Sequence, residues 1–266
     1  MAKTFGFIGC GNMGGALAKA VSLAGYQNDI LLADLNTGKV KSLSLEISAE
    51  PSTAQTVAGE CDFIFIGVKP QMLADCFAEI KSELDVREIK PVIVSMAAGV
   101  AVSDIKKMSG IDSVIRIMPN MPVSVGSGVV LACADGVSDE NKAIFEKSMS
   151  KAGMFDWLDE KYIDAASALS GCGPAFVYMF AQALADGAVA CGLPRDKALY
   201  YAAGTLSGAA KMILECDKHP ETLKDEVCSP GGSTIMGVKA LEDEGMRGAV
   251  INAVIASYNR TKELGK

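Results

Sequence analysis

The segment Thr4–Gly15, T-F-G-F-I-G-C-G-N-M-G-G, decides how the rest of the chain can be interpreted. Its apolar run Phe5–Ile8 is typical of a short buried strand, and Gly9-x-Gly11-x-x-Gly14 follows directly. Gly9 permits a tight turn from strand to helix, Gly11 lets a pyrophosphate approach the backbone, and Gly14 lets the helix pack closely on the strand. This order of residues is typical of a dinucleotide-binding unit.

The residues that follow extend the pattern. Ala16–Ala24 predicts a helix, and the N–H groups at its start, around Asn12 and Met13, would face the phosphates. The next predicted strand, Ile30–Ala33, ends at Asp34, twenty residues past Gly14, where a carboxylate can bind a ribose hydroxyl. A glycine-rich turn in an ordinary βαβ unit is the alternative.

Length and charge limit the classes of protein that fit. The chain has 266 residues, enough for two domains or one large one. Its net charge is −7 and its basic residues are scattered, which argues against nucleic acid or an anionic membrane as a partner. Phe5–Cys10 is too short for the apolar region of a signal peptide. We therefore expect a cytoplasmic protein.

The longest apolar stretch, Gly173–Leu193, raises the question of a membrane span. Gln182 and Asp186 interrupt it, so we interpret it as a buried helix of a soluble protein.

Cysteine and histidine give no metal or disulfide pattern. The eight cysteines are irregularly spaced without a C-x-x-C pair, which indicates reduced thiols and neither a disulfide framework nor a zinc site. The only histidine, His219, precedes Pro220 and is better explained as a residue at a helix entry than as a catalytic group.

The first half alternates strands with helices. Apolar runs predict further strands at Phe63–Val68, Pro91–Met96, Val114–Met118 and Gly128–Ala134, and helices lie between several of them. Such alternation predicts an α/β domain with a doubly wound, mostly parallel sheet. Ser52 or Thr53 can cap a helix at Ala54–Glu60, and Ser138 can cap one at Asp139–Lys151.

In an open α/β sheet the ligand lies beyond the carboxyl ends of the strands. The residues at these positions that we expect to contact the cofactor are Val68, Lys69 and Pro70, then Ala97, Ala98 and Gly99, and Asn120. The small residues leave space for a flat ring, and Lys69 and Asn120 supply polar groups. For each of these residues, a role in forming the turn after its strand is as good an explanation as cofactor contact.

After Leu158 the chain reads as helices separated by Gly and Pro, so we place a domain boundary near Asp159, between residues 1–158 and 159–266. The predicted helices Pro174–Cys191 and Arg195–Glu215 are apolar or small nearly all round. A helix that is apolar on every side must be covered by other protein segments. A domain of about a hundred residues is too small to bury all of its own helices in this way. We therefore expect a bundle that a second subunit completes.

One loop interrupts this helical half. Ser229-Pro230-Gly231-Gly232-Ser233-Thr234 lies between a predicted helix at Pro220–Val227 and another that starts near Thr234. Its backbone N–H groups and hydroxyls can form a cradle for a small carboxylate. A plain connector between helices with an N-cap is an equally good interpretation.

Several motifs together resemble the pyrroline-5-carboxylate reductase family over almost the full length. They are Gly6-Phe7-Ile8-Gly9-Cys10-Gly11-Asn12-Met13, Val68-Lys69-Pro70, Ala97-Ala98-Gly99, Arg116-x-Met118-Pro119-Asn120-x-Pro122, Ala168-Leu169-Ser170-Gly171-Cys172-Gly173-Pro174-Ala175 and Asp225-x-Val227-Cys228-Ser229-Pro230-Gly231-Gly232-Ser233-Thr234-Ile235. The last two are highly specific, whereas many dehydrogenases share the first.

The resemblance implies a reductase that makes L-proline from 1-pyrroline-5-carboxylate with NADP(H) or NAD(H). It also implies a Rossmann domain and a helical dimerisation domain interlocked with its partner, in dimers that can form a decamer. Asp34 favours NAD(H), whereas Asn36, with Thr37 and Lys39, can cradle the 2′-phosphate of NADP(H).

The resemblance also assigns the substrate site. It implies that Ser229, Gly231, Gly232 and Ser233 bind the substrate carboxylate and that Thr234, the one catalytic residue expected, bonds the ring nitrogen. In this picture Ser170–Pro174 opens a helix that borders the same site. Cys172 stands where the family often has Ser, and Ser233 where Thr or Ala is common; both are small, so we expect little change.

Three other classes of protein remain as alternatives. A β-hydroxyacid dehydrogenase would carry a catalytic Lys on the first long helix of its second domain, and Ala175–Cys191 has none. A short-chain dehydrogenase needs Tyr-x-x-x-Lys; Tyr258 and Lys262 have this spacing but lie on the last predicted helix, where they form an i,i+4 pair. A non-catalytic dinucleotide sensor would share the fold.

Overall fold

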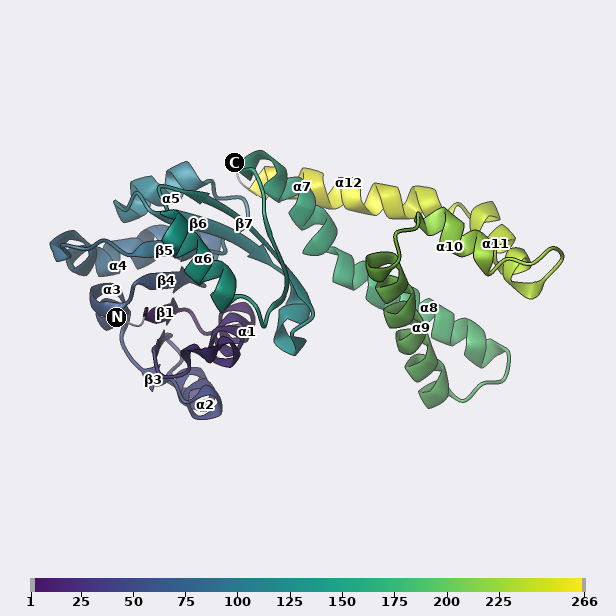
Figure 1. Cartoon of the computed structure of the whole chain (residues 1–266), viewed down its shortest axis with the longest axis horizontal. Coiled ribbons are helices and arrows are strands. Elements are labelled where there is room, and N and C mark those ends of the chain that lie inside the picture. The colour runs from purple at the N-terminus through teal and green to yellow at the C-terminus, as the bar shows by residue number, and fades with distance from the viewer. Residues whose placement is uncertain (1–2, 265–266) are drawn as a thin grey trace. The chain divides into compact units, whose positions relative to one another are not determined.

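The computed structural model of the chain describes residues 3–264 (Figure 1). It divides into two compact units. The first contains the residues up to Cys172 and those from Ser257 onward, and the second contains Gly173–Ala256.

The first unit is built on one eight-stranded sheet. Its strands are β1 (Phe5–Ile8), β2 (Ile30–Ala33), β3 (Glu50–Pro51), β4 (Phe63–Ile66), β5 (Val92–Ser95), β6 (Val114–Pro119), β7 (Gly128–Asp135) and β8 (Gly153–Trp157). They lie in the order β3-β2-β1-β4-β5-β6-β7-β8, and only the pair β6 and β7 is antiparallel. The predicted fold class, a doubly wound and mostly parallel sheet, is confirmed.

Helices cover both faces of this sheet. They are α1 (Asn12–Val21), the π-helix η1 (Ser22–Tyr26), α2 (Thr37–Ile47), α3 (Ala54–Glu60), the short 3-10 helix η2 (Pro70–Met72), α4 (Leu73–Val86), α5 (Val102–Ser109), the 3-10 helix η3 (Met121–Val125), α6 (Asp139–Ser148) and α7 (Glu160–Ser170). The core shared with α1, α2 and α6 lies on one face, and the core shared with α3, α4, α5 and α7 lies on the other.

Because both faces are covered, the central strands β1, β2 and β4 are apolar or glycine along their whole length. Phe63 and Phe65 of β4 point into the first core and stack on Phe5 and Phe7 of β1, with ring centroids 5.2 and 4.4 Å apart. Ile64, between them, points into the second core. This explains why short uninterrupted apolar runs identified the strands.

Most predicted elements are present, but two strands were missed. Thr53 and Ser138 cap α3 and α6 as expected. The strand β3 has only two residues, both exposed, and β8 is a half-exposed edge strand, so neither has the apolar run that marks a buried strand.

The second unit is helical, as predicted. It contains α8 (Gly173–Ala190), α9 (Arg195–Glu215), α10 (Pro220–Glu226), α11 (Ser233–Asp243) and most of α12 (Met246–Leu264). In Figure 1, α8 and α9 run side by side, and they pack through a small alanine core of Ala185, Ala198 and Ala202. His219 caps α10 by accepting from the Glu221 N–H at 3.2 Å, which confirms its predicted place at a helix entry.

The expectation that α8 is a buried helix is wrong for the single chain, where only Ala185 of this helix is buried. Composition predicts that such a helix must be covered, but not that the same chain covers it. By length and composition alone, Glu160–Ala190 could also cross a membrane, which is weak evidence because core helices of soluble proteins pass the same test.

Candidate active site

The candidate cofactor site lies where the strand order reverses. β1 sits between β2 and β4, so the chain winds away from β1 in both directions, and ligands of doubly wound sheets bind at this point. Gly9 follows β1 and Gly67 follows β4. Their N–H groups continue the sheet, from Gly9 to the Ala33 carbonyl and from Gly67 to the Ile8 carbonyl, each at 2.8 Å.

Three glycines allow the backbones to meet at this point. Gly9 has φ +99°, and a Cβ there would come within 2.7 Å of the Gly67 carbonyl carbon. A Cβ on Gly14 would lie 2.0 Å from the Gly9 carbonyl oxygen, and one on Gly67 would lie 2.6 Å from the same oxygen. The tight turn and the close packing of helix on strand that Gly9 and Gly14 predicted are therefore present.

Gly11 differs from these glycines because a Cβ there would meet no protein atom within 4 Å. It is the N-cap of α1, and no side chain caps this helix start. The first N–H groups of α1, near the exposed Asn12 and the partly buried Met13, therefore face a region open to an anion. A cavity of about 380 Å³ adjoins the turn, lined among others by Cys10, Gly11, Asn12, Lys19, Lys39 and Ser42.

Asp34 braces the glycine turn. One carboxylate oxygen accepts from the Cys10 N–H at 2.7 Å and the other from the Asn36 N–H at 2.8 Å. Each oxygen keeps a lone pair that can still accept from a ribose hydroxyl. Burial raises the pKa of the Cys10 thiol to about 12, and the charge of Asp34 adds to the effect, so Cys10 stays a neutral packing residue.

Asn36 forms the start of α2. Its side-chain oxygen accepts from the N–H groups of Gly38 and Lys39, at 3.1 and 3.2 Å. The side-chain oxygen of Asn36 is thus occupied as a helix cap, and its Nδ2 group is the part of the side chain that can donate to a 2′-phosphate. Lys39 is the residue of this segment that lines the cavity.

The other predicted cofactor residues share the carboxyl edge of the sheet. Val68, Lys69 and Pro70 follow β4, Ala97, Ala98 and Gly99 follow β5, and Asn120 follows β6. Gly99 has φ +73°, as a glycine turn requires, and Lys69 is exposed. Their contacts with a cofactor stay predictions.

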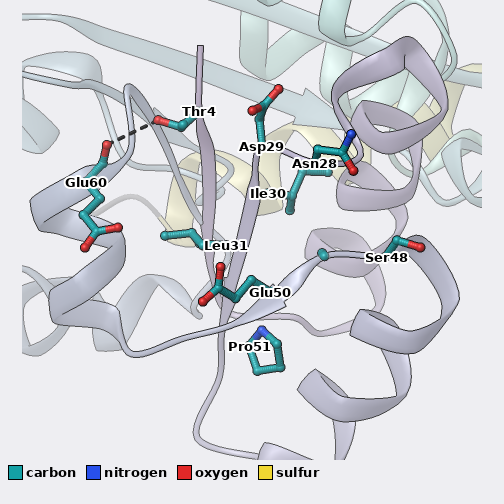
Figure 2. Close-up of a pocket in the computed structure, with 10 residues that line it drawn as sticks. Thr4, Asn28, Asp29, Ile30, Leu31, Ser48, Glu50, Pro51 and Glu60 are labelled. Atoms are coloured by element: carbon teal, nitrogen blue, oxygen red, sulfur yellow. Dashed lines mark hydrogen bonds between the residues drawn. The ribbon is translucent and has the colours of Figure 1, made fainter. Parts of the chain in front are cut away.

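A larger cavity than the one at the glycine turn, about 570 Å³, lies at the opposite edge, where β1 and β2 begin (Figure 2). Asp29, Glu50 and Glu60 are among its lining residues, and the Thr4 hydroxyl bonds the Glu60 carbonyl at 3.3 Å. Carboxylates disfavour an anionic pyrophosphate. Size alone would therefore identify the wrong edge of the sheet.

In the second unit, the predicted substrate loop forms a tight turn. The Gly232 N–H bonds the Ser229 carbonyl at 3.0 Å, and Gly231 has φ +68°. Gly232 is the N-cap of α11, no side chain caps this helix, and Ser233 and Thr234 are its first two residues. The hydroxyl of Thr234, an exposed residue, is therefore not consumed as an N-cap.

Sequence reasoning missed the buried polar residues under α7. Arg116 of β6 is buried and pairs with Asp164 at 2.6 Å and Glu160 at 3.5 Å. The available signal was an arginine inside the apolar strand V-I-R-I-M-P. Its partners, 44 and 48 residues later, had no signal of their own.

The sheet, the glycine turn and the uncapped start of α1 define a dinucleotide-binding protein. Residues 4–99 match the family model described as NADP oxidoreductase, coenzyme F420-dependent, and residues 160–264 match pyrroline-5-carboxylate reductase dimerisation. Pyrroline-5-carboxylate reductase of Arabidopsis thaliana is 40% identical over 268 residues, which cover 98% of this chain and 95% of the relative. The chain belongs to the pyrroline-5-carboxylate reductase family.

Solved structures agree over the full length. The chain resembles a pyrroline-5-carboxylate reductase from Coxiella burnetii with a TM-score of 0.91 and 31% identity, covering 100% of both chains. It resembles the Plasmodium falciparum pyrroline carboxylate reductase with NADP bound with a TM-score of 0.87 and 29% identity, covering 99% of this chain and 98% of the other.

The Tyr-x-x-x-Lys spacing has a structural explanation. The Lys262 ammonium lies 4.6 Å from the centroid of the Tyr258 ring, within α12. The predicted i,i+4 helical pair is confirmed.

Substitutions at Gly14 and Gly11 should have different effects, the first on stability and the second on NADPH binding. Gly14→Ala places a methyl group against the Gly9 carbonyl and should cost at least about 1–3 kcal/mol of unfolding free energy. Gly11→Ala meets no protein atom and should cost less than about 1 kcal/mol, yet weaken NADPH binding by about tenfold or more, because the methyl group occupies the anion's approach.

Thermal unfolding and fluorescence titration with NADPH measure the two effects. If Gly11→Ala bound NADPH as tightly as wild type, the pyrophosphate would not lie at this turn.

Proposed function

We propose that this chain catalyses the NAD(P)H-dependent reduction of 1-pyrroline-5-carboxylate to L-proline, the last step of proline biosynthesis. The observation that carries the proposal is the intact glycine turn, with its uncapped helix start, in a full-length member of this reductase family. The test is the fall of NAD(P)H absorbance on addition of 1-pyrroline-5-carboxylate, with proline identified as the product.

The reaction requires little general acid–base catalysis by protein side chains. A hydride is added to the imine carbon of the protonated ring and its electrons convert the iminium to an amine, while NAD(P)H is oxidised to NAD(P)⁺. When bound, NAD(P)H supplies this hydride. Because the protonated imine is already a strong electrophile, the side chains have to hold the carboxylate and orient the ring. This explains why the only histidine serves as a helix cap.

The groups of the first unit fit a dinucleotide. The uncapped start of α1 and the open space at Gly11 suit a pyrophosphate, and Asp34 retains capacity to accept from a ribose hydroxyl. We assign the cofactor to Gly9, Gly11, Asn12, Met13, Gly14, Asp34, Asn36, Val68, Lys69, Pro70, Ala97, Ala98 and Gly99. Asn120 was predicted with these residues, but we leave it out because its side-chain amide already bonds the Ser170 carbonyl and the Val129 N–H.

The substrate is assigned to the turn before α11. We propose that the backbone N–H groups and hydroxyls of Ser229, Gly231, Gly232 and Ser233 bind its carboxylate. The positive end of the α11 dipole and the uncapped N–H groups of this helix support the assignment, since both favour an anion. Thr234 then offers its hydroxyl to the ring nitrogen.

Self-association is indicated by the dimerisation domain that residues 160–264 match. We propose an obligate dimer, able to assemble up to a decamer, with domains at 1–158 and 159–266. Large apolar side chains left exposed in the second unit support it, among them Met179 and Tyr200 at 73% and 76% exposure. Exposed apolar surface of this extent marks an interface.

We further propose a cytoplasmic enzyme whose small-molecule partners are its cofactor, 1-pyrroline-5-carboxylate and L-proline, and which binds neither nucleic acid nor a membrane. The net charge of −7 supports this, since it disfavours anionic surfaces.

The assembly can be tested by sedimentation at low micromolar concentration. We expect a dimer or a larger species, because the apolar faces of the second unit need cover. A stable, folded monomer of 27.7 kDa would contradict the proposal.

The cofactor preference should be moderate. Asp34 disfavours a 2′-phosphate, but its oxygens already accept from two backbone N–H groups, and Lys39 lies at the adjoining cavity. We expect both NADPH and NADH to work, with kcat/KM values that differ by less than roughly a thousandfold, about 4 kcal/mol. Lys39→Ala should lower kcat/KM for NADPH by about fivefold, ~1 kcal/mol, and leave NADH unchanged. Two results would contradict this prediction: a larger ratio of the two kcat/KM values in wild type, or an equal loss of kcat/KM with NADPH and NADH in Lys39→Ala.

Thr234→Ala should weaken transition-state binding by about 1.4–2.8 kcal/mol, roughly ten- to a hundredfold in kcat/KM, without abolishing activity. As the ring nitrogen passes from iminium to amine, a group that only donates becomes one that also accepts. A hydroxyl can bond both states. Steady-state kinetics at saturating NADPH measure the effect.

The matched control is Thr234→Ser, which keeps the hydroxyl and should retain most of the activity. If the alanine variant equalled wild type while binding cofactor normally, the ring nitrogen would find its partner elsewhere.

A further inference from the structure

A buried arginine stands on the sheet face that carries α7. Val114 and Met118, two residues to either side on β6, belong to the apolar core of this face, and Ile115 and Ile117 point to the other. Arg116 lies between them with its side chain only 4% exposed. Burying a guanidinium among apolar residues is costly, so its partners must compensate its charge.

All of the described ion pairs of this guanidinium go to α7. Nη2 donates to Asp164 at 2.6 Å and Nη1 to Glu160 at 3.5 Å, whereas Nε has no hydrogen-bond partner among the described residues. Glu160 also accepts from the N–H of Val102, the first residue of α5, at 2.7 Å. The first half of α7 is thus fixed to β6 and to the start of α5.

A second contact fixes the end of the same helix. Asn120, directly after β6 and 7% exposed, donates through Nδ2 to the carbonyl of Ser170 at 2.9 Å. Its Oδ1 accepts from the N–H of Val129 on β7, also at 2.9 Å. Both halves of this amide are therefore satisfied within the protein.

The two contacts are spaced to prevent α7 from sliding or turning. Asp164 and Ser170 are six residues apart, about 9 Å along a helix, and Arg116 and Asn120 are four residues apart, about 13 Å along a strand. Apolar packing of Ile163 and Ala168 allows such movement more readily, because it has no preferred direction.

We propose that Arg116 and Asn120 are positioning residues for the reduction, which hold α7 on the sheet and thereby set the segment Ser170–Pro174 that follows it. The inference rests on the proposed function and on the family resemblance, which implies that this segment borders the substrate. Asn120 then acts on the reaction through α7 and not as a ligand of the cofactor.

The test uses two substitutions at Asn120. Asn120→Asp keeps the oxygen that accepts from Val129 but replaces the donor to Ser170 by an oxygen, whereas Asn120→Ala removes both bonds. We expect both variants to lose roughly ten- to a hundredfold in kcat, since a displacement of about 1 Å costs on this scale. The dissociation constant of NADPH should stay within about twofold of wild type because no bond to cofactor is removed.

Amide hydrogen exchange separates the α7 contact from the β7 contact. Exchange at the end of α7 should accelerate in both variants, whereas exchange at the Val129 amide should accelerate only in Asn120→Ala. Arg116→Lys keeps a charge that can reach one carboxylate and should lose less kcat than Arg116→Met. Lys106→Met, which breaks a 2.6 Å pair between α5 and Asp135 that includes no residue of α7, is the control and should keep kcat/KM within about twofold.

Three results would overturn the inference. One is a kcat of Asn120→Asp equal to that of wild type. Another is an NADPH dissociation constant that rises in step with the loss of activity, which would make Asn120 a cofactor ligand. The third is an unchanged exchange rate in α7. Failure of wild type to reduce 1-pyrroline-5-carboxylate would instead refute the proposed function, and the exchange rates would still report on the two contacts.

Discussion

The approach of three backbone segments at one point is the constraint on which the first unit depends. The turn after β1, the turn after β4 and the start of α1 converge so closely that a Cβ on Gly14 or Gly67 would lie 2.0 or 2.6 Å from the same carbonyl oxygen. Only glycine tolerates this crowding. The convergence brings the uncapped N–H groups of α1 to the switch point of the sheet, and Asp34 holds the turn by accepting from the Cys10 N–H. A dinucleotide site follows from the backbone before any side chain contributes.

The opposite requirement governs α7, where orientation depends on polar side chains. Hydrophobic burial holds the helix against β6 and β7 but does not fix its rotation, because the effect is non-directional. Hydrogen bonds and ion pairs are directional, and a buried charge without its partner is strongly disfavoured. The Arg116 and Asn120 contacts therefore specify one arrangement of the helix that leads into the second unit.

The features that could be predicted from the sequence are those that depend on residues close together along the chain. The bounds of β1, β2, α3 and α9 agree with the predicted runs. Residue type and position identified the cap at Ser138, the cap at Thr53 as one of two candidates, and the place of His219 at a helix entry. The strands β3 and β8 were missed because edge strands need no apolar run. The partners of Arg116 could not be found, because 44 or more residues of chain separate them from it and only tertiary packing brings them together. Whether Thr234 was a cap or a free hydroxyl also depended on one backbone detail, the position at which α11 begins.

The helices of the second unit bury little of their apolar surface within one chain. Ala185, Ala198 and Ala202 form the only buried apolar core assigned to the described residues of this unit, and alanine buries little area. Larger apolar side chains, such as Tyr200 and Ile251, stay exposed at 76% and 58%. This core is much smaller than the two cores of the first unit. We therefore expect the stability of the second unit to depend more on association with another chain. The match of residues 160–264 to a dimerisation domain indicates self-association, and in the dimer that we propose a second copy of the chain provides this cover. The proposed substrate turn precedes α11 of this unit, so in the proposed dimer it belongs to the part of the chain that associates, whereas the glycine turn of the first unit is supported within one chain.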